Sequence, residues 1–426
     1  MKIIESLKIK EKEYIEKLDN GMTVIIIPKP NLEKKYIIWG TKFGSIDNRF
    51  IVKDSEEVII PDGVAHFLEH KMFEQPDGTN SLDTLMALGL DANAYTTNDH
   101  TAYLFECTEN FYEGLDELMN YVQHPYFTQE NVEKEKGIIS QEIKMYDDEP
   151  AWRLYMNAMD CMYEKNPIKI DIAGSVESIK KITPDILYKC YNTFYNPSNM
   201  IMVICGNFEP EKIIEEIKNR LVSTKEEQQI KRIYPEKESK INKKFKEIEM
   251  EVSIPLFAIG FRDFIEEYNT EEIVKKHIAI EILLNMIIGE SSETYKELYG
   301  KGNLISEPDM DYEFSEEYAH ILISGRSKEP NAVREKIEET INQYLNNGLD
   351  EKHFNRIKKK IYGNYVSEYN SVGDIARMFL ADKIKDIDSF DYIEKYNCVT
   401  KEYTESVLKN VFKTDNMVMS VVRNKK

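Results

Sequence analysis

Residues 66–70 read His66-Phe67-Leu68-Glu69-His70, and this stretch decides the fold and the chemistry expected of the chain. On a helix each residue advances by about 100°, so the two imidazoles lie roughly 40° apart on one face. Both can then direct a nitrogen at one metal ion, and Glu69 lies beside them. An imidazole pair suits zinc, and catalytic zinc usually takes three protein ligands and one water. The stretch therefore predicts a zinc hydrolase site that needs a third ligand from elsewhere.

The carboxylate of Glu69 supplies a candidate general base. Zinc would lower the pKa of its bound water to about 7, and a neighbouring carboxylate could take the proton as that water attacks a carbonyl. The alternative is an ordinary amphipathic helix that carries two histidines, because Val64, Phe67, Leu68 and Phe73 give it an apolar side. Further motifs in the chain are needed to favour a metal site over this alternative.

Two glutamates seven residues apart, Glu135 and Glu142, are candidates for the missing ligand. Seven residues are two helical turns with a drift of about 20°, so both side chains lie on one stripe of a helix. One can ligate while the other steadies the site. Without the histidines, the pair would be two members of a solvated acidic face. Asp147, Asp148 and Glu149 stay open as alternative ligands.

A third motif connects these observations with a known family. In chain order the motifs are His66 to His70, then Asn93-Ala94-Tyr95-Thr96, then Glu135 with Glu142. The chain thereby resembles the pitrilysin family of zinc metallopeptidases, most densely from Gly63 to Tyr146. The resemblance implies that His66, His70 and Glu142 hold one Zn²⁺ per chain. It also implies two catalytic glutamates, with Glu69 as the general base and Glu135 supporting the ligands.

The segment Asp91 to Glu106 is predicted to form two short strands joined at Asn98-Asp99-His100. The family counterpart of its first strand is an exposed sheet edge, which can bind an extended peptide by strand addition. Residues Asn93, Ala94, Tyr95 and Thr96 are therefore the expected substrate-binding residues. The alternative is an ordinary hairpin that is paired inside the sheet.

Composition and charge bound the setting of the protein. The formal net charge of −20 argues against nucleic acid as a partner, since no basic face is evident in the sequence. No run of the chain reaches the length of a membrane span, and the N-terminus lacks the apolar core of a signal peptide. The five cysteines include no C-x-x-C pair and fit a reducing compartment. We therefore expect a cytoplasmic protein that does not interact with membranes.

The order of elements predicts an α+β protein with two related halves. We expect a zinc-bearing catalytic domain at 1–222, a charged linker at 223–246 and a related zinc-free domain at 247–426. The main elements expected are strands 22–27, 36–40, 199–205, 248–252, 256–261, 319–324 and 416–422, and helices 109–123, 128–146, 150–163, 210–221, 273–288, 332–344, 353–365 and 374–383, with a further helix capped by Ser81. The family fold implies two α/β roll domains, each an antiparallel sheet flanked by helices, that form half of a clamshell.

The second half departs from the family pattern at one point. Active relatives carry an arginine and a tyrosine seven residues apart in the zinc-free half, and here Tyr299 and Ser306 stand at those places. Tyr295 or Arg326 could substitute if the alignment slips. Otherwise a sister subunit that lacks the zinc motif should supply the pair, so we expect a heterodimer rather than a homodimer.

The expected function is cleavage of short or unfolded peptides by a zinc endopeptidase inside a chamber. The alternatives are a scaffold or peptide-maturation partner with little proteolysis of its own, and a hydrolase of a non-peptide amide. The sequence does not define the substrate, the cleavage preference or the metal used in the cell.

Overall fold

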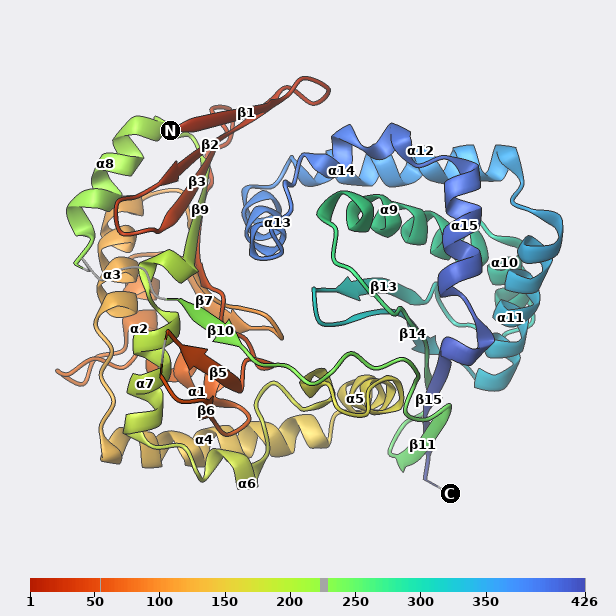
Figure 1. Ribbon diagram of the computed structural model, residues 1–426, viewed down its shortest axis with the longest axis horizontal. Coiled ribbons are helices and arrows are strands. Elements are labelled where there is room, and N and C mark those ends of the chain that lie inside the picture. Colours follow the sequence, from red (N-terminus) through yellow and green to blue (C-terminus); the bar gives the residue numbers. More distant parts are fainter. Residues whose placement is uncertain (54, 223–228, 426) are drawn as a thin grey trace. The chain divides into compact units, whose positions relative to one another are not determined.

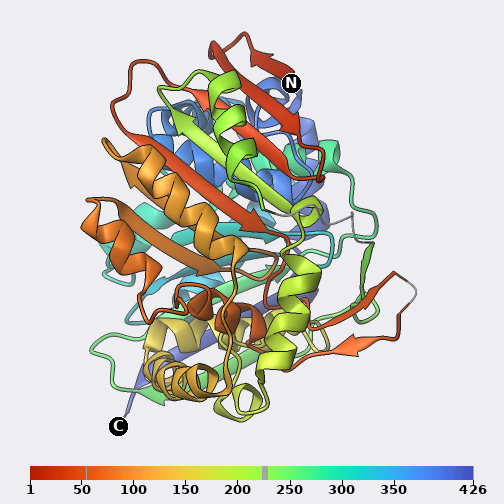
Figure 2. The ribbon, with the colours of Figure 1, turned by 90° about the vertical axis from the view of Figure 1, so that its left-hand side faces the viewer.

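The computed structural model describes residues 1–53, 55–222 and 229–425, and the chain divides into two compact units. Unit 1 comprises Met1–Ile143, Ile170–Tyr234 and Ser367–Ser389, and unit 2 comprises Lys144–Lys169, Pro235–Val366 and Phe390–Lys426. Each unit thus contains a segment from the part of the sequence that mainly builds the other unit. Figure 1 shows both units in one view, and Figure 2 shows the elements of unit 1 from the side.

This division differs from the contiguous domains expected at 1–222 and 247–426. Residues 144–169 belong to unit 2, and residues 367–389 belong to unit 1. The expected linker at 223–246 is also partly structured, because β10 (Ile230–Arg232) pairs with β5 (Arg49–Val52). Residues 223–228 of that linker lie outside the described residues.

Unit 1 is built on a seven-stranded sheet with the order β1-β2-β3-β9-β4-β8-β7. Its strands are β1 (Lys2–Ser6), β2 (Glu11–Lys17), β3 (Thr23–Pro28), β4 (Lys35–Thr41), β7 (Asp91–Thr96), β8 (Thr101–Cys107) and β9 (Met200–Gly206). All neighbours are antiparallel except β3 and β9, which run parallel. Every residue of β9 is buried, which explains the unbroken apolar run in its sequence, since a strand covered on both faces needs no polar alternation.

Helices and a small sheet complete unit 1. The small sheet has the order β10-β5-β6, with β6 at Val58–Ile59. The helices of this part of the chain are α1 (Val64–Lys71), α2 (Ser81–Ala87), α3 (Phe111–Gln123), α4 (Gln129–Asp147), α6 (Val176–Ile179), α7 (Pro184–Phe194) and α8 (Pro210–Arg220). Helix α13 (Val372–Ile384) comes from the second half of the sequence but belongs to unit 1, and we call it an exchanged helix. It packs against β9 and β4. Unit 1 is therefore incomplete without residues from near the end of the chain.

Unit 2 contains a five-stranded sheet with the order β11-β15-β12-β14-β13. The strands are β11 (Phe245–Met250), β12 (Leu256–Arg262), β13 (Asp309–Phe314), β14 (Ala319–Arg326) and β15 (Met417–Asn424), and the helices are α5 (Pro150–Met162), α9 (Thr270–Ile287), α10 (Glu293–Gly300), α11 (Pro330–Asn347), α12 (Glu351–Glu368), α14 (Asp391–Glu394) and α15 (Lys401–Val411). Helix α5, which comes from the first half of the sequence, packs against β15 and β12.

The two large sheets share one topology. Strands β3-β9-β4-β8-β7 of unit 1 correspond to β11-β15-β12-β14-β13 of unit 2, both in sequence order and in spatial order. The first pair runs parallel in each sheet and the other pairs run antiparallel. The expected fold class is confirmed: the protein is α+β, with two related sheets that are flanked by helices.

Each sheet also has a glycine beneath its exchanged helix. A Cβ atom built on Gly40 in β4 would lie 2.8 Å from Cδ1 of Leu380 in α13, and one built on Gly260 in β12 would lie 2.8 Å from Cε of Met162 in α5. The exchanged helices therefore approach the two central strands more closely than a side chain would allow.

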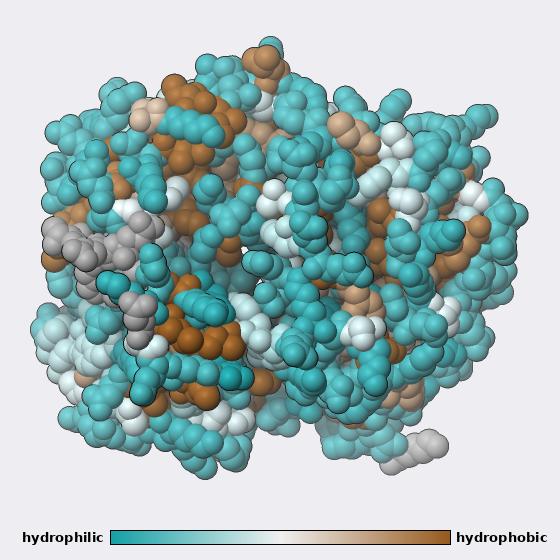
Figure 3. Space-filling view, viewed as in Figure 1, coloured by the Kyte–Doolittle hydropathy of each residue, from teal (hydrophilic) through white to brown (hydrophobic). Residues whose placement is uncertain are grey.

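The expected helices and strands all occur, with end points that shift by a few residues. Asn80, and not Ser81, caps α2, because the Asn80 side chain accepts a hydrogen bond from the amide of Leu82. The structure also contains elements that the sequence patterns did not predict, namely the strands β1, β2, β5, β6, β10 and β13 and the helices α6, α7, α10, α14 and α15. Within the described residues, no helix has both the length and the apolar character needed to cross a membrane. The surface visible in Figure 3 is mostly hydrophilic.

Candidate metal centre

Helix α1 presents the histidine pair because of how it starts and what it buries. It begins after Gly63, whose φ of +90° lies in the left-handed region, and a Cβ atom there would lie 2.4 Å from the carbonyl oxygen of Ala173. Glycine is required at this position. Val64, Phe67 and Leu68 are buried on one side of the helix. The helix is thereby fixed against the core.

The structure brings His66, His70 and Glu142 together, although Glu142 lies on a different helix, α4. Nε2 of His66 is 3.5 Å from Oε1 of Glu142, and Nε2 of His70 is 3.5 Å from Oε2 of the same carboxylate. Donor atoms about 2.0–2.2 Å from a tetrahedral zinc ion lie roughly 3.3–3.6 Å apart, and each of these nitrogen–oxygen separations is of that size. Among the described residues, these three form the one group of histidine, cysteine and carboxylate side chains placed to hold a metal.

Glu135 contacts the opposite nitrogen of His70. Its Oε1 lies 3.1 Å from Nδ1 of His70, which donates the hydrogen bond. That bond selects the tautomer in which Nε2 carries the lone pair, and Nε2 is the atom that faces Glu142. Glu135 and Glu142 are seven residues apart, which is about two helical turns, so both lie on one side of α4, as the sequence spacing predicts.

The electrostatics of the cluster agree with a cation site. Burial lowers the pKa of His70, but the carboxylates of Glu135, Glu69 and Glu142 outweigh this effect and raise it above the ordinary value. A hydrogen bond from His66 lowers the pKa of Glu142 despite partial burial. Burial raises the pKa of Glu135, but His70 and Lys71 lower it more strongly, so that its net shift is downward. The three acids thus present negative charge to the two imidazoles.

Glu69 lies beside the cluster and is tied to the neighbouring strand. Only 8% of its surface is exposed, and its Oε2 accepts a 2.6 Å hydrogen bond from the hydroxyl of Thr96. Thr96 ends β7, which among the described strands pairs only with β8 and forms the edge of the seven-stranded sheet. The expected edge strand is confirmed, and the hairpin paired inside the sheet is not what forms.

The other residues of the 93–96 motif differ in their contacts. Asn93 is exposed, and its side chain accepts a hydrogen bond from the amide of Ala94. The hydroxyl of Tyr95 lies 3.3 Å from Nε2 of His100 in the β7–β8 loop. Of the four residues, Thr96 is joined by its side chain to Glu69, beside the cluster.

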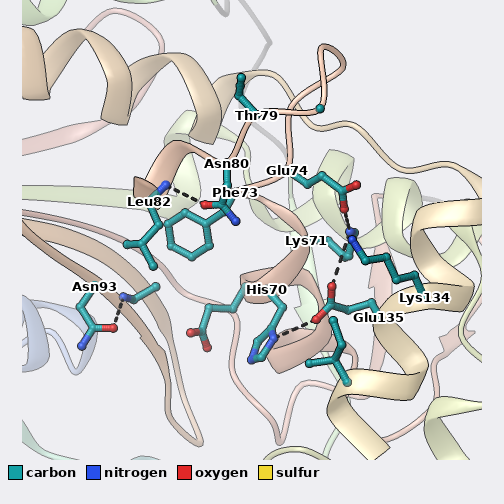
Figure 4. Close-up of a pocket in the computed structure, with 14 residues that line it drawn as sticks. His70, Lys71, Phe73, Glu74, Thr79, Asn80, Leu82, Asn93, Lys134 and Glu135 are labelled. Atoms are coloured by element: carbon teal, nitrogen blue, oxygen red, sulfur yellow. Dashed lines mark hydrogen bonds and ion pairs between the residues drawn. The ribbon is translucent and has the colours of Figure 1, made fainter. Parts of the chain in front are cut away.

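A pocket of about 420 Å³ lies next to the cluster within unit 1. Figure 4 shows His70 and Glu135 along one side and Asn93 of the edge strand along the other. Apolar side chains also line it, among them Phe73, Leu82 and Ile138. The pocket therefore leaves open space between the edge strand and the candidate metal centre.

The acids left open as alternative ligands have other partners. Asp147 forms a 2.9 Å ion pair with Arg153, and Glu149 caps the N-terminus of α5. Both side chains and that of Asp148 are exposed. None of them belongs to the group that could hold a metal.

The residues discussed for the second half lie in unit 2. Tyr299 is 54% exposed on α10, where its ring stacks on that of Tyr295 at 5.5 Å between centroids. Ser306 is exposed, and Arg326 is the last residue of β14 and is also exposed.

Comparison with known proteins identifies the family of the chain. The model of Insulinase (Peptidase family M16) matches residues 59–175, and that of the Peptidase M16 inactive domain matches residues 181–361. YmfH of Bacillus subtilis (strain 168), described as an uncharacterized zinc protease, is 38% identical over 99% of both chains. The chain belongs to peptidase family M16. The predicted resemblance to the pitrilysin family is thereby confirmed.

Solved structures agree with this assignment to family M16. The crystal structure of a putative M16-like peptidase from Alicyclobacillus acidocaldarius matches with a TM-score of 0.94 and 33% identity, over 99% of this chain and all of that one. A protease from Helicobacter pylori shares the fold with a TM-score of 0.81 at 19% identity, over 97% of this chain and 100% of that one. The matched region 59–175 contains the whole histidine and glutamate cluster of this M16 chain.

One residue beside the cluster was missed by the sequence analysis. Lys71, directly after His70, is 1% exposed and contacts both Glu74 and Glu135. The signal in the sequence was a lysine at a position where the apolar stripe of α1 calls for a hydrophobic residue.

Proposed function

We propose that this protein is a zinc-dependent endopeptidase that cleaves short or unfolded peptides. The observation that carries the proposal is the convergence of His66, His70 and Glu142 next to the buried carboxylate of Glu69. In this assignment the first three residues hold one zinc ion and Glu69 is the general base. Membership of family M16 supports the assignment, and relatives such as YmfH are named zinc proteases.

The residues divide the reaction between them. When bound, zinc supplies a Lewis acid and lowers the pKa of a coordinated water to about 7. Glu69 would accept a proton from the attacking water as the water oxygen bonds to the carbonyl carbon of the peptide. It then delivers the proton to the amine as the carbon–nitrogen bond breaks. Glu135 orients His70, and the products are a carboxylate and a free amine.

The edge strand β7 is the proposed binding site for the peptide backbone. An unpaired strand edge offers alternating amide donors and carbonyl acceptors, which recognise an extended chain with little dependence on its side chains. Residues Asn93–Thr96 of this edge lie close to the cluster, because the hydroxyl of Thr96 contacts Glu69.

We further propose a sister subunit as partner. The proposal takes Tyr299 and Ser306 to stand where the family pattern has an arginine and a tyrosine, and such donors stabilise the developing oxyanion. A sister chain without the zinc motif would supply the missing pair. The cytoplasm is the proposed compartment, since all five cysteines are free and four of them are buried.

The decisive experiment compares wild type with Glu69→Gln for zinc content and cleavage of a quenched peptide. We expect equal zinc content and no detectable cleavage by the variant, because the amide cannot accept the proton. Glu149→Gln is the matched control, since it makes the same substitution at an exposed acid outside the cluster. Wild-type turnover by Glu69→Gln would remove Glu69 as the base, and a wild-type protein that binds no divalent metal would remove the peptidase assignment.

The partner is tested by purification from the native host. A sister chain that co-purifies and raises peptide cleavage by orders of magnitude would support the heterodimer. Full activity of the lone chain would contradict it. Zinc binding without cleavage, whether alone or with the partner, would favour the scaffold role. Mass spectrometry of the products would distinguish peptide cleavage from hydrolysis of another amide.

A further inference from the structure

One lysine of α1 occupies a position that the helical pattern assigns to an apolar side chain. Val64, Phe67 and Leu68 are buried at positions i, i+3 and i+4, and Lys71 at i+7 continues the same stripe with 1% exposure. Burying an unpaired ammonium group costs several kcal/mol, so a lysine is kept in such a place only with charged partners.

The partners of Lys71 connect it with the candidate metal centre. Its Nζ contacts the carboxylate of Glu74 and lies 3.6 Å from Oε2 of Glu135. The other oxygen of that carboxylate, Oε1, lies 3.1 Å from Nδ1 of His70. Glu135 is therefore held at both oxygens, by the lysine on one side and by the imidazole on the other (Figure 4).

Removing one of these contacts would free the carboxylate to turn. The terminal torsion of a glutamate is soft, so two fixed oxygens define its plane far better than one. The side chain of Glu135 is only 11% exposed. The direction in which the imidazole of His70 points depends on that plane.

We propose that Lys71 is a positioning residue, which acts through Glu135 to keep Nε2 of His70 directed at Glu142. The proposal rests on the proposed function, because it takes His70 as a metal ligand. It assigns a role to a residue outside the histidine and glutamate motifs.

The test is a double-mutant cycle on zinc affinity, measured by competition with a chromophoric chelator. Lys71→Met keeps the length and packing of the side chain but removes its charge, and we expect zinc to bind about 10–100-fold more weakly. Glu135→Gln should weaken binding to a similar degree. In the Glu135→Gln background, Lys71→Met should cause no further loss, because the lysine acts through that carboxylate.

A lysine with a merely structural role would give a different pattern. Lys71→Met would then lower the melting temperature and leave zinc affinity unchanged, and this result would overturn the proposal. Independent, additive losses in the double variant would overturn it as well. The matched control is Lys29→Met, which removes a mostly buried lysine paired with Glu11 at 2.6 Å elsewhere in unit 1 and should not change zinc affinity.

If Lys71→Met does not fold, Lys71→Gln carries the test, because its neutral amide can still donate to a carboxylate. We expect a loss of about threefold to tenfold there, and wild-type zinc affinity would contradict the proposal. Wild-type protein that binds no zinc overturns this inference and the proposed function together. Wild type that binds zinc and cleaves peptide, with Lys71 variants of equal affinity, overturns the inference alone.

Discussion

The hydroxyl of Thr96 donates a 2.6 Å hydrogen bond to Oε2 of Glu69, so the last residue of the edge strand is joined directly to the proposed base. Thr96 lies on β7 and Glu69 on α1. The strand proposed to bind the peptide and the group proposed to move the proton therefore have a fixed relative position. In the proposed mechanism, this contact orients the base Glu69. It also fixes where the scissile bond lies relative to that base.

Thr96→Val should slow catalysis without loss of the metal. Valine keeps the shape and strand preference of threonine, but Glu69 loses a donor that orients it. A hydrogen bond to a charged group is worth about 1.5–3 kcal/mol, so kcat should fall roughly 10–100-fold. Steady-state kinetics and zinc content check this result. Thr84→Val on α2, outside the cluster, is the control, and an unchanged kcat for Thr96→Val would contradict the role of the contact.

Zinc binding should weaken as the pH falls. A protonated His70 cannot ligate, and its carboxylate neighbours raise its pKa above the ordinary value of 6.5 despite burial. Competition from protons should thus begin above pH 6.5 on lowering the pH. Glu135→Gln removes one source of the raised pKa, so its decline in affinity should begin at lower pH. Zinc titrations between about pH 8 and 5.5 measure both curves. Coincident pH profiles for the two proteins would contradict this assignment.

Two buried acids should make the protein less stable as the pH rises. Burial, together with nearby acids, raises the pKa of Asp382 from 3.8 to about 7, and burial and Asp388 raise that of Glu13 from 4.5 to about 7. The folded state therefore holds more protons than the unfolded state between these values. Stability is greatest below the unfolded pKa values and declines until the pH exceeds the folded ones.

Asp382→Asn should remove the part of the stability loss at rising pH that comes from Asp382. The variant should gain stability over wild type at pH 8, on the order of a few kcal/mol, and gain little at pH 4. Denaturant unfolding at several pH values measures the difference. Asp386→Asn, at a side chain that is 75% exposed, is the control. A gain for Asp382→Asn that does not depend on pH would refute the linkage.

Gly40→Val should destabilise unit 1 through the exchanged helix. The new side chain would collide with Leu380, which α13 places over β4. Overpacking of this kind typically costs about 1–3 kcal/mol. Leu380→Ala creates space, so the double variant should be more stable than the sum of the two single losses predicts. Unfolding experiments on the three proteins check this coupling, and simple additivity would count against the close approach.

Gly363→Ala gives the opposite expectation in unit 2. This glycine lies inside α12, and a Cβ atom there would meet no atom within 4 Å. Alanine has a higher helix propensity, so the substitution should stabilise the protein by about 1 kcal/mol. A loss of stability in the same unfolding experiment would mean that the position is more crowded than the structure shows.

The sequence predicted the fold class and the site because their signals are local or strongly patterned. The spacing of His66 and His70 on one helix, and of Glu135 and Glu142 on another, is enough to place each pair on a face. That the two faces meet is a matter of tertiary packing. The family resemblance, and not helical geometry, selected Glu142 among the nearby acids.

The missed features have physical reasons. Strand β13 lies at the edge of its sheet and reads Asp309-Met310-Asp311-Tyr312-Glu313-Phe314. Its three acidic residues are typical of a loop, so the sequence did not indicate a strand. Strand β10 lies in a charged stretch that resembles a linker, because its order comes from pairing with the distant β5. The unit to which α5 or α13 belongs depends on contacts between residues far apart in sequence. The hydrophobic periodicity of a helix does not predict such contacts.

The exchange of α5 and α13 bears on how the protein is made. When the ribosome has completed Tyr234, the first unit still lacks the helix that covers β4 and β9, and that helix ends only at Ile384. At about 5–20 residues per second, the nascent sheet waits on the order of ten seconds with β4 and β9 uncovered where α13 later packs. Expression of residues 1–222 alone would leave that exposure permanent, and such fragments should depend on chaperones or precipitate.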